Sequence, residues 1–356
     1  MKAITLYDVA RLAGVSYQTV SRVINEAEHV SARTREKVLR AMAELHYVPN
    51  RGAQQLAGKR TRTLGLITTD LALHAPSQIA SAVKSRAGEQ GASVLISMVE
   101  RPEQCQAALQ ELLAQRVDAL LVNVPLDDPY AELLQSIASP VPILFLDVAP
   151  SAEVNSLVFD AGQGARLGAE HLLALGHRRI ALLSGPQDAV SAKARLAGWR
   201  DVLAQADLQP AGEACGDWSA ASGYEKGHQL LSGAELPEAI LVANDQMALG
   251  VIRACTEKGV AVPGQIAIVG FDDTADSAWF TPPLTTIRQA FREAGEQSVE
   301  WLLAPTQGET RWQKQLPVTL IIRQSSAPRA PLQAEREDLA RQLRSLAVLA
   351  EKIARG

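Results

Sequence analysis

The sequence is poor in aromatic residues and cysteines, and it has no long hydrophobic run. Phe, Trp and Tyr make up 4% of the 356 residues, so aliphatic side chains must fill any core. Cys105, Cys215 and Cys255 are scattered and form no CxxC pair, so neither a disulfide framework nor a zinc site is supported. No stretch reaches the roughly 20 apolar residues of a membrane-spanning helix, and the opening MKAITLYDVA lacks a signal-peptide run. We expect a soluble protein of a reducing, cytoplasmic compartment, with no membrane partner.

Catalytic and metal-binding motifs are missing as well. The chain contains no GxSxG and no HExxH, and its six histidines show no ligand spacing. Asp272 and Asp273 are neighbours, so on a strand their side chains would point apart and could not work as a pair. We therefore expect no enzymatic activity, no cofactor and no metal.

The sequence does contain enough apolar material for several folded domains, and its charge is unevenly distributed. The length and the 47% of apolar residues predict two or three domains. Residues 1–62 hold 11 Lys and Arg against 5 Asp and Glu, a balance of +6. The remaining 24 of the 35 basic residues face 34 of the 39 acidic ones, a balance of −10. A basic head on an acidic body indicates an anionic partner for the head, although a solvated basic surface is the alternative.

Three short helices are predicted in this head. Thr5 and Asp8 fit a capping box, and Gly14 ends the first helix in a turn of helix-turn-helix length. Ser16 suits the cap of a second helix, from about Tyr17 to Asn25, and Ser31 the cap of a third. Apolar residues at helical spacing predict a shared core: Leu6, Val9, Ala10 and Ala13; Val20, Val23 and Ile24; Val38, Ala41, Met42 and Leu45.

The second predicted helix carries polar residues on a face that lies outside this core. Such a helix fits the major groove of B-DNA, where Arg pairs with guanine and Gln with adenine. We therefore expect Tyr17, Gln18 and Arg22 to read bases. Short polar side chains nearby suit phosphate oxygens: Ser16, Thr19, Ser21, Asn25, Ser31 and Thr34. A three-helix bundle with an ordinary solvated face is the alternative.

The segment TLYDVARLAGVSYQTVSRVIN resembles the DNA-binding head of the LacI/GalR family of bacterial repressors. In that family the first two residues of this helix and its Arg discriminate between operators. The resemblance therefore implies that Tyr17, Gln18 and Arg22 recognise a palindromic operator of the lac type. It extends along nearly the whole chain.

Residues 49–61 link the head to the body. Barely two helical turns fit between Pro49 and Gly58, too few for a stable helix alone in water. The resemblance implies a hinge helix that folds on the operator, pairs with its twin and inserts Leu56 into the minor groove as a wedge. A plain linker with one stray leucine is the alternative. Gly52 stands where a β-branched residue is expected, so we expect this hinge to fold less readily.

From about residue 62, short aliphatic runs alternate with amphipathic stretches. The runs are TLGLITT, ASVLISMV, DALLVN, PILFLD, NSLVFD, RIALLSG, AILVAND and IAIVGFDD. Runs this apolar indicate strands buried on both faces, joined by helices in parallel βαβ units. Eight such strands are more than we expect in one sheet. We therefore expect an α/β body of two parallel-sheet lobes, with a ligand cleft at the carboxyl ends of the strands.

Polar residues cluster at these predicted strand ends: Thr68, Thr69, Asn123, Asp147, Asn244, Asp245, Asp272 and Asp273. Carboxylates and amides with one Arg and one Trp suit a sugar, whose hydroxyls take bidentate acceptors and whose apolar face stacks on an aromatic ring. The spacing of Gly162, Gly164 and Gly168 hints at a dinucleotide instead. The next strand, RIALLSG, ends without the acidic ribose ligand that such a site requires.

The resemblance implies a core like that of periplasmic sugar-binding proteins and assigns the inducer site residue by residue. The apolar wall would be Leu73, Ala75, Pro76 and Ile79, and the hydrogen-bond partners would be Asp147, Arg195, Asn244 and Asp272. Trp218 would stack on the sugar ring. Asn123, Phe159, Ser191, Gln289 and Phe291 also match the family's site. Thr69 and Ala189 depart from the serines expected there, and Ala189 loses a hydroxyl, which puts the preference among galactosides in doubt.

The resemblance also implies domain boundaries. These are a head at 1–48, a hinge at 49–61, a core at 62–324, a linker at 325–335 and an oligomerisation helix at 336–356. Three crossovers, near Asp160-Ala161, Ile287-Arg288 and Val318-Thr319, would divide the core into two lobes. The N-lobe would comprise about 62–160 and 288–318, and the C-lobe about 161–287 and 319–324.

A two-fold operator requires a two-fold protein. The resemblance implies that Lys84, Trp279 and Phe280 lie in a dimer interface, although packing within one lobe is an equal alternative for the two aromatics. Apolar residues near the end of the chain follow heptad spacing: Leu339, Leu343, Leu346, Ala350 and Ile353. This seam resembles a tail that joins two dimers through an antiparallel four-helix bundle. A frayed, solvated helix is the alternative.

Together these expectations describe a sugar-responsive repressor that a galactoside releases from its operator. A family member that answers to another sugar or to a corepressor is the first alternative. A purine corepressor would favour aromatic stacking on both faces of the cleft, and one Trp is evident. A cytoplasmic sugar-binding enzyme is the alternative outside the regulators.

Overall fold

The computed structural model describes residues 4–24, 30–48, 62–304 and 311–326. Contacts divide the chain into two units, residues 1–61 and 62–356. Several residues that the sequence singled out lie outside the described residues: Asn25, Gly52, Leu56, Leu339, Leu343, Leu346, Ala350 and Ile353.

Three helices form the first unit: α1 (Leu6–Ala13), α2 (Tyr17–Ile24) and α3 (Ala32–Glu44). The capping box is present, since the Asp8 carboxylate accepts from the Thr5 N–H at 2.9 Å and from its hydroxyl at 2.7 Å. Gly14 ends α1 with a φ of 65°, a left-handed conformation that favours glycine. The predicted apolar stripes meet in one small core, whose fully buried side chains are Val9, Val20 and Val38.

The second unit is built on two six-stranded sheets. The first contains β1 (Thr63–Thr68), β2 (Ser93–Met98), β3 (Ala119–Asn123), β4 (Ile143–Phe145), β5 (Ser156–Phe159) and β11 (Gln313–Leu316). The second contains β6 (Ile180–Ser184), β7 (Gly212–Cys215), β8 (Ala239–Val242), β9 (Ala267–Asp272), β10 (Thr285–Gln289) and β12 (Val318–Ile321). Their orders are β11-β5-β4-β3-β1-β2 and β12-β10-β9-β8-β6-β7. Neighbouring strands are parallel except for β10 and β12.

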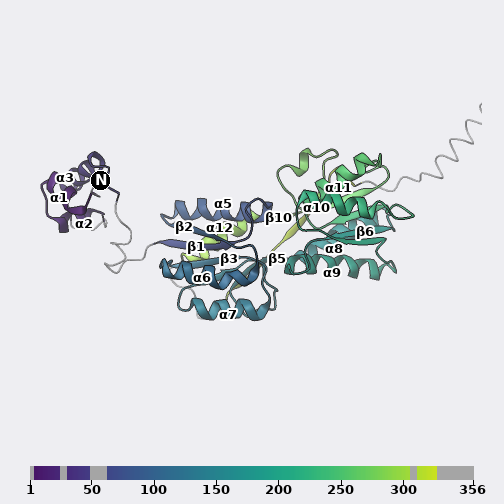
Figure 1. The fold of residues 1–356 in the computed structure, drawn as a ribbon, viewed down its shortest axis with the longest axis horizontal. Coiled ribbons are helices and arrows are strands. Elements are labelled where there is room, and N and C mark those ends of the chain that lie inside the picture. The colour runs from purple at the N-terminus through teal and green to yellow at the C-terminus, as the bar shows by residue number, and fades with distance from the viewer. Residues whose placement is uncertain (1–3, 25–29, 49–61, 305–310, 327–356) are drawn as a thin grey trace, which may run out of the picture. The chain divides into compact units, whose positions relative to one another are not determined.

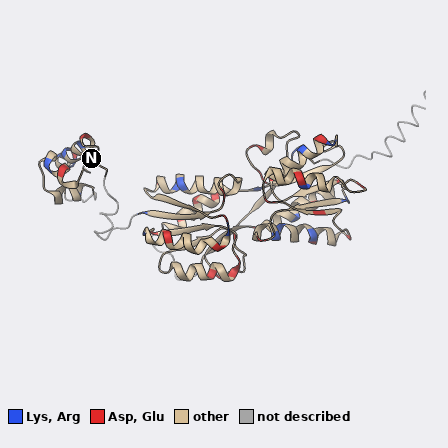
Figure 2. Cartoon of the chain, in the orientation of Figure 1, with Lys and Arg blue, Asp and Glu red and all other residues tan. Residues whose placement is uncertain are grey.

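Helices cover both faces of each sheet (Figure 1). The first lobe has α5 (His74–Glu89) and α12 (Phe291–Leu302) on one face, and η1 (Pro102–Gln104), α6 (Cys105–Ala114) and α7 (Asp128–Ala138) at the other. The second lobe has α8 (Ala161–Ala174), α9 (Val190–Gln205), α10 (Ala220–Leu230), α11 (Asp245–Glu257) and η2 (Ser277–Trp279). Charged side chains lie mostly on helices and loops, and the strands carry few of them (Figure 2). No helix among the described residues is long and apolar enough to cross a membrane.

The predicted α/β fold with two parallel-sheet lobes is therefore confirmed, and the chain passes between the sheets three times. It leaves the first sheet at Asp160, returns at Ala290 and crosses again at Pro317. The last two crossings differ slightly from the predicted Ile287-Arg288 and Val318-Thr319. The reason is that β10 continues in the second sheet to Gln289, which pairs there with Val318.

Two of the glycines that hinted at a dinucleotide site, Gly164 and Gly168, lie where α8 packs against the second sheet. A Cβ on Gly164 would lie 2.6 Å from Cζ of Phe271, and one on Gly168 would lie 3.4 Å from a Val269 methyl. The missing side chains let α8 pack closely against the second sheet.

Candidate functional site

The predicted base-reading residues lie on the solvent-exposed side of α2. Tyr17, Gln18 and Arg22 are exposed, whereas Val20 and Val23 of the same helix are buried. The ring of Tyr17 lies 5.3 Å from that of Tyr7, centroid to centroid, and Tyr7 is itself 63% exposed. Sequence reasoning did not single out Tyr7, because no periodic pattern marks it. The two rings extend the exposed surface beyond α2.

The predicted phosphate contacts lie at helix starts. Ser16 Oγ accepts from the Thr19 N–H at 3.2 Å, and Ser31 Oγ accepts from the Thr34 N–H at 3.3 Å. Both serines are therefore caps and remain exposed, while Thr19, Ser21 and Thr34 are half-buried. Backbone N–H groups at a helix start favour phosphate, so the caps and a phosphate site can coincide.

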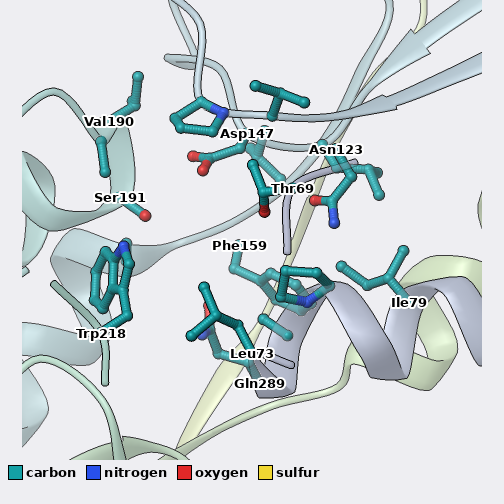
Figure 3. Close-up of a pocket in the computed structure, with 18 of the residues that line it drawn as sticks. Thr69, Leu73, Ile79, Asn123, Asp147, Phe159, Val190, Ser191, Trp218 and Gln289 are labelled. Atoms are coloured by element: carbon teal, nitrogen blue, oxygen red, sulfur yellow. The ribbon is translucent and has the colours of Figure 1, made fainter. Parts of the chain in front are cut away.

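A cavity of about 880 Å³ is lined by residues of both lobes (Figure 3). Every residue that the sequence assigned to the inducer site lines it: Leu73, Ala75, Pro76, Ile79, Asn123, Asp147, Phe159, Ser191, Arg195, Trp218, Asn244, Asp272, Gln289 and Phe291. Thr69 and Ala189 line it too. Of the polar strand ends, Thr68, Asp245 and Asp273 do not.

The cavity has an apolar side and an aromatic side. Leu73 and Ile79, from the start of α5, lie across the cavity from Trp218 (Figure 3). Phe159 and Phe291 pack edge to face, with ring centroids 5.4 Å apart. The Trp218 indole facing an aliphatic wall suits a sugar, which has one apolar face and many hydroxyls.

Trp218 is held in a strained conformation by its neighbours. Its φ of 76° is rare for an aromatic residue, and its carbonyl accepts from Asn244 Nδ2 at 3.0 Å. Asn244 Oδ1 in turn accepts from the Met247 N–H at 2.9 Å and caps α11. The indole lies against Gly185, where a Cβ would come within 2.2 Å of the ring. Asn244 thus positions Trp218 while lining the cavity itself.

Arg195 is the buried cation of the site. It is 5% exposed, and its guanidinium lies 3.8 Å above the Phe271 ring and 5.5 Å from the Trp218 ring. Nη1 donates to the carbonyl of Ala243, and Nη2 lies 3.8 Å from Asp272 Oδ1. Its Nε has no hydrogen-bond partner among the described residues. A ligand oxygen could take up this donor.

Two carboxyl groups in the cavity have raised pKa values. Burial raises the pKa of Asp272 to about 7, Arg195 opposes this shift, and Asp245 adds to it. Burial also raises the pKa of Asp147 to about 6, against the lowering effects of Arg195 and the Ser191 N–H. A carboxyl group in such dry surroundings accepts hydrogen bonds from sugar hydroxyls, and it can also donate one while it is protonated.

A hydrogen bond that the sequence did not predict joins the lobes near the cavity. The His74 N–H donates to Gln246 Oε1 at 3.0 Å, from the start of α5 to the first turn of α11. Both residues line the cavity. No local pattern could have found this contact, because it depends on how the two lobes meet.

The predicted dimer residues differ in exposure. Trp279 is 84% exposed, and Lys84 is exposed on α5. Phe280 instead packs against the core of the second lobe. Ile96 and Met98 are exposed on the edge strand β2. Phe280 therefore packs partly within its own lobe, and its place in a dimer interface stays a prediction, as does that of Trp279.

A helix-turn-helix head followed by a two-lobed, ligand-binding core defines a ligand-controlled DNA-binding regulator. A family model described as bacterial regulatory proteins, lacI family, matches residues 5–50. A second model, a periplasmic binding protein-like domain, matches residues 169–326. The chain is 55% identical over 341 residues to the lactose operon repressor of Escherichia coli (strain K12), covering 93% of this chain and 95% of that protein. The chain therefore belongs to the lacI family of bacterial regulatory proteins and is a transcription regulator rather than an enzyme.

A second lactose operon repressor and a solved structure are also similar to most of the chain. The lactose operon repressor of Klebsiella pneumoniae is 45% identical over 345 residues, covering 96% of this chain and 97% of that protein. A crystal structure of the lac repressor dimer bound to operator and the anti-inducer ONPF superimposes with a TM-score of 0.86 at 55% identity. That match covers 92% of this chain and all of that one.

Proposed function

We propose that this protein represses transcription by binding a palindromic lac-type operator, and that a galactoside bound in the cavity releases it. The observation that carries the proposal is that every residue assigned to the inducer site from the sequence lines one cavity. The similarity of the chain to lactose operon repressors supports a galactoside as the ligand. A protein that binds the bacterial chromosome acts in the cytoplasm.

On the DNA side, α2 would enter the major groove. Arg22 would donate two hydrogen bonds to a guanine, and Gln18 would pair with an adenine edge. Tyr17 would contact a thymine methyl. One head reads only a few base pairs, so a dimer is required for a palindrome, with Lys84 and Trp279 at its interface and Leu56 as the minor-groove wedge. The tail at residues 336–356 would join two dimers into a tetramer.

On the ligand side, a sugar would touch both lobes at once. Trp218 would stack on its apolar face, and Arg195 and Asp272 of the second lobe would bind its hydroxyls. Asn123 and Asp147 would do so from the first lobe. Because the lobes meet at three crossovers, a sugar that fits one lobe angle better than another shifts the population toward that angle. Release requires tighter sugar binding in the DNA-free conformation, since equal affinity would shift nothing.

A gel shift tests the proposal directly. The full-length protein, with a labelled lac-type palindrome, should retard the DNA without ligand and lose it on titration with a β-galactoside.

Arg22→Lys should weaken operator binding about tenfold or more and keep sugar binding, because Lys cannot form the two-pronged contact with guanine. Arg195→Lys should bind the operator and resist release. A protein that held the operator equally with and without every galactoside tried would refute the proposal.

The same gel shift separates the alternatives. A purine corepressor would tighten operator binding rather than release it. Leu73 and Ile79, rather than an aromatic ring, lie opposite Trp218, and two other rings of the cavity, Phe159 and Phe291, pack edge to face against each other.

A further inference from the structure

Strand β9 ends in two successive residues with unusual backbone conformations. Asp272 has a φ of 116° and Asp273 a φ of 55°, both in the left-handed region that favours glycine. Non-glycine residues keep such conformations only where their surroundings over-determine them. The side chain of Asp272 faces the cavity, and that of Asp273 does not line it.

Asp273 is held from two sides. Its Oδ2 accepts from Arg288 Nε at 2.6 Å, and its Oδ1 accepts from Arg323 Nη2 at 2.6 Å. The Asp273 side chain is 7% exposed and that of Arg323 18% exposed, so at least one of these ion pairs is shielded from water. Arg323 also donates from Nη1 to the carbonyl of Leu284 at 2.8 Å, which fixes its own position.

Arg288 and Arg323 together clamp the carboxylate of Asp273. This clamp lies next to Asp272, the cavity residue with the unusual φ. Arg288 is the register partner of Asp272 in the pairing of β9 with β10. On the cavity side, Asp272 Oδ1 accepts from Gln289 Nε2 at 2.8 Å. Asp272 is therefore bound through its side chain on one side, and through the backbone that it shares with Asp273 on the other.

We propose that Asp273, clamped by Arg288 and Arg323, is a positioning residue that keeps the backbone of Asp272 left-handed and so aims its carboxylate at the ligand. The backbone part of this inference stands alone, and the ligand part rests on the proposed galactoside site. A clamp that only stabilised the lobe would affect every ligand equally and would leave the end of β9 unchanged.

The first test needs no sugar. Hydrogen–deuterium exchange of the full-length protein reports on the Asp273 N–H, which donates to Thr286 Oγ1, and on the Thr274 N–H, which donates to Asp245 Oδ2. In Asp273→Asn these amides should exchange about tenfold faster, the size expected for losing a hydrogen bond to a charged group. Asn accepts the left-handed conformation as readily as Asp, so the substitution removes the charge and one of the two acceptor oxygens with little change in backbone preference.

The control is Glu213→Gln, which removes a carboxylate that pairs with Arg200 elsewhere on the same lobe. It should leave these amides unchanged. Unchanged exchange in Asp273→Asn would overturn the proposal. If Asp273→Asn fails to fold, Arg323→Lys takes its place. It keeps the positive charge and loses the two-pronged contact with Asp273 and Leu284, and the same result is expected from it.

The second test uses the ligand. Asp273→Asn should bind a β-galactoside about tenfold more weakly than the parent protein. In a panel of monodeoxy galactosides this loss should vanish for the analogue that lacks the hydroxyl bound by Asp272. An equal loss for every analogue would overturn the positioning role. If the parent protein binds no galactoside, the proposed function fails, and the exchange experiment still decides whether the clamp exists.

Discussion

At the scale of single residues, the cavity depends on backbone conformations that the residue types do not announce. Trp218 and Asp272 both have positive φ, and each is held by groups distant in sequence: Asn244 holds the first, and Gln289 with the Asp273 clamp holds the second. Strain of this kind concentrates at functional sites. A sequence pattern can name these residues, but it cannot show how they are held, because the contacts come from other elements.

Gly185→Ala tests the support of the Trp218 ring. A Cβ at this position would lie 2.2 Å from the indole, so the ring must move away from the place where it would stack on a sugar. We expect galactoside affinity to fall about tenfold, the order of a lost aromatic contact, and operator binding without sugar to stay unchanged. Isothermal titration calorimetry measures the first quantity. Gly88→Ala is the matched control, because a Cβ at Gly88 meets nothing within 4 Å. Equal sugar affinity in both variants would contradict this account.

The buried carboxyl of Asp272 should leave a signature in the pH dependence of stability. Its folded-state pKa is about 7 and its ordinary value is 3.8, so the folded protein keeps a proton that the unfolded chain releases. Stability due to this group is therefore present at low pH and is lost as the pH rises from about 4 to about 7. Asp272→Asn removes the effect, so its free energy of unfolding should fall less steeply in this window, by up to about 1.4 kcal/mol per pH unit.

Unfolding of the parent protein and of Asp272→Asn across this pH range measures the difference. Comparing the two cancels the contributions of groups that do not interact with Asp272, such as His74 and His171, whose pKa values burial lowers. Asp245 is the exception, because its charge raises the pKa of Asp272 and its own pKa is raised to about 6. Parallel stability curves would show that Asp272 has an ordinary pKa.

At the scale of elements, the sequence predicted the eight strands that its aliphatic runs mark, including the partly exposed edge strand β2, and missed β7, β10, β11 and β12. The eight aliphatic runs correspond to β1 to β6, β8 and β9. The edge strand β7 alternates between exposed and half-buried residues, and β11 is mostly exposed, so neither contains a continuous apolar run. Central β10 was missed for another reason. Its buried Thr285 and Thr286 are polar, and each is satisfied by hydrogen bonds to a distant part of the chain.

Gly14→Ala tests the turn between α1 and α2. Gly14 has a φ of 65°, and a Cβ there would meet nothing within 4 Å, so the cost arises from the backbone alone. We expect the head to lose about 1 kcal/mol of stability and operator binding to weaken, while sugar affinity stays the same. Circular dichroism of thermal unfolding and a gel shift measure the two effects. Undiminished stability of the head would show that the turn tolerates a side chain.

Gly52→Val tests the hinge, whose residues lie outside those that the structure describes. The argument rests on the sequence: Gly inside a helix costs about 1 kcal/mol relative to Ala, and a two-fold dimer incurs this cost twice. Val recovers only part of this cost, so restoring a β-branched residue should tighten operator binding by about threefold. Titration of the operator in a gel shift measures the gain, and an unchanged dissociation constant would show that the hinge does not fold as a helix on DNA.

At the scale of the whole molecule, residue patterns and family resemblance predicted different parts of the site. Patterns alone marked the carboxyl ends of the strands, and Thr69, Asn123 and Asp147 do line the cavity. They could not separate these from Asp245, which is fully buried and accepts from Thr274, Ser277 and Thr286. Both kinds of residue end a buried strand. Only the meeting of the two lobes decides which of them face a ligand.

The number of subunits in the assembly can be tested by truncating the chain. Removing residues 336–356 deletes the predicted heptad seam of Leu339, Leu343, Leu346, Ala350 and Ile353 and keeps every residue that the structure describes. A seam of little more than two heptads is too short to keep a lone helix folded, so its residues stabilise a helix only when several copies pack together. The truncated protein should sediment as a dimer where the full chain sediments as a tetramer, with unchanged affinity for one operator and for the sugar. It should lose the ability to hold two operators on one DNA molecule, because that depends on linkage within one particle rather than on either binding site. If the full-length protein already sediments as a dimer, the seam does not join two dimers, and the tetramer prediction is wrong.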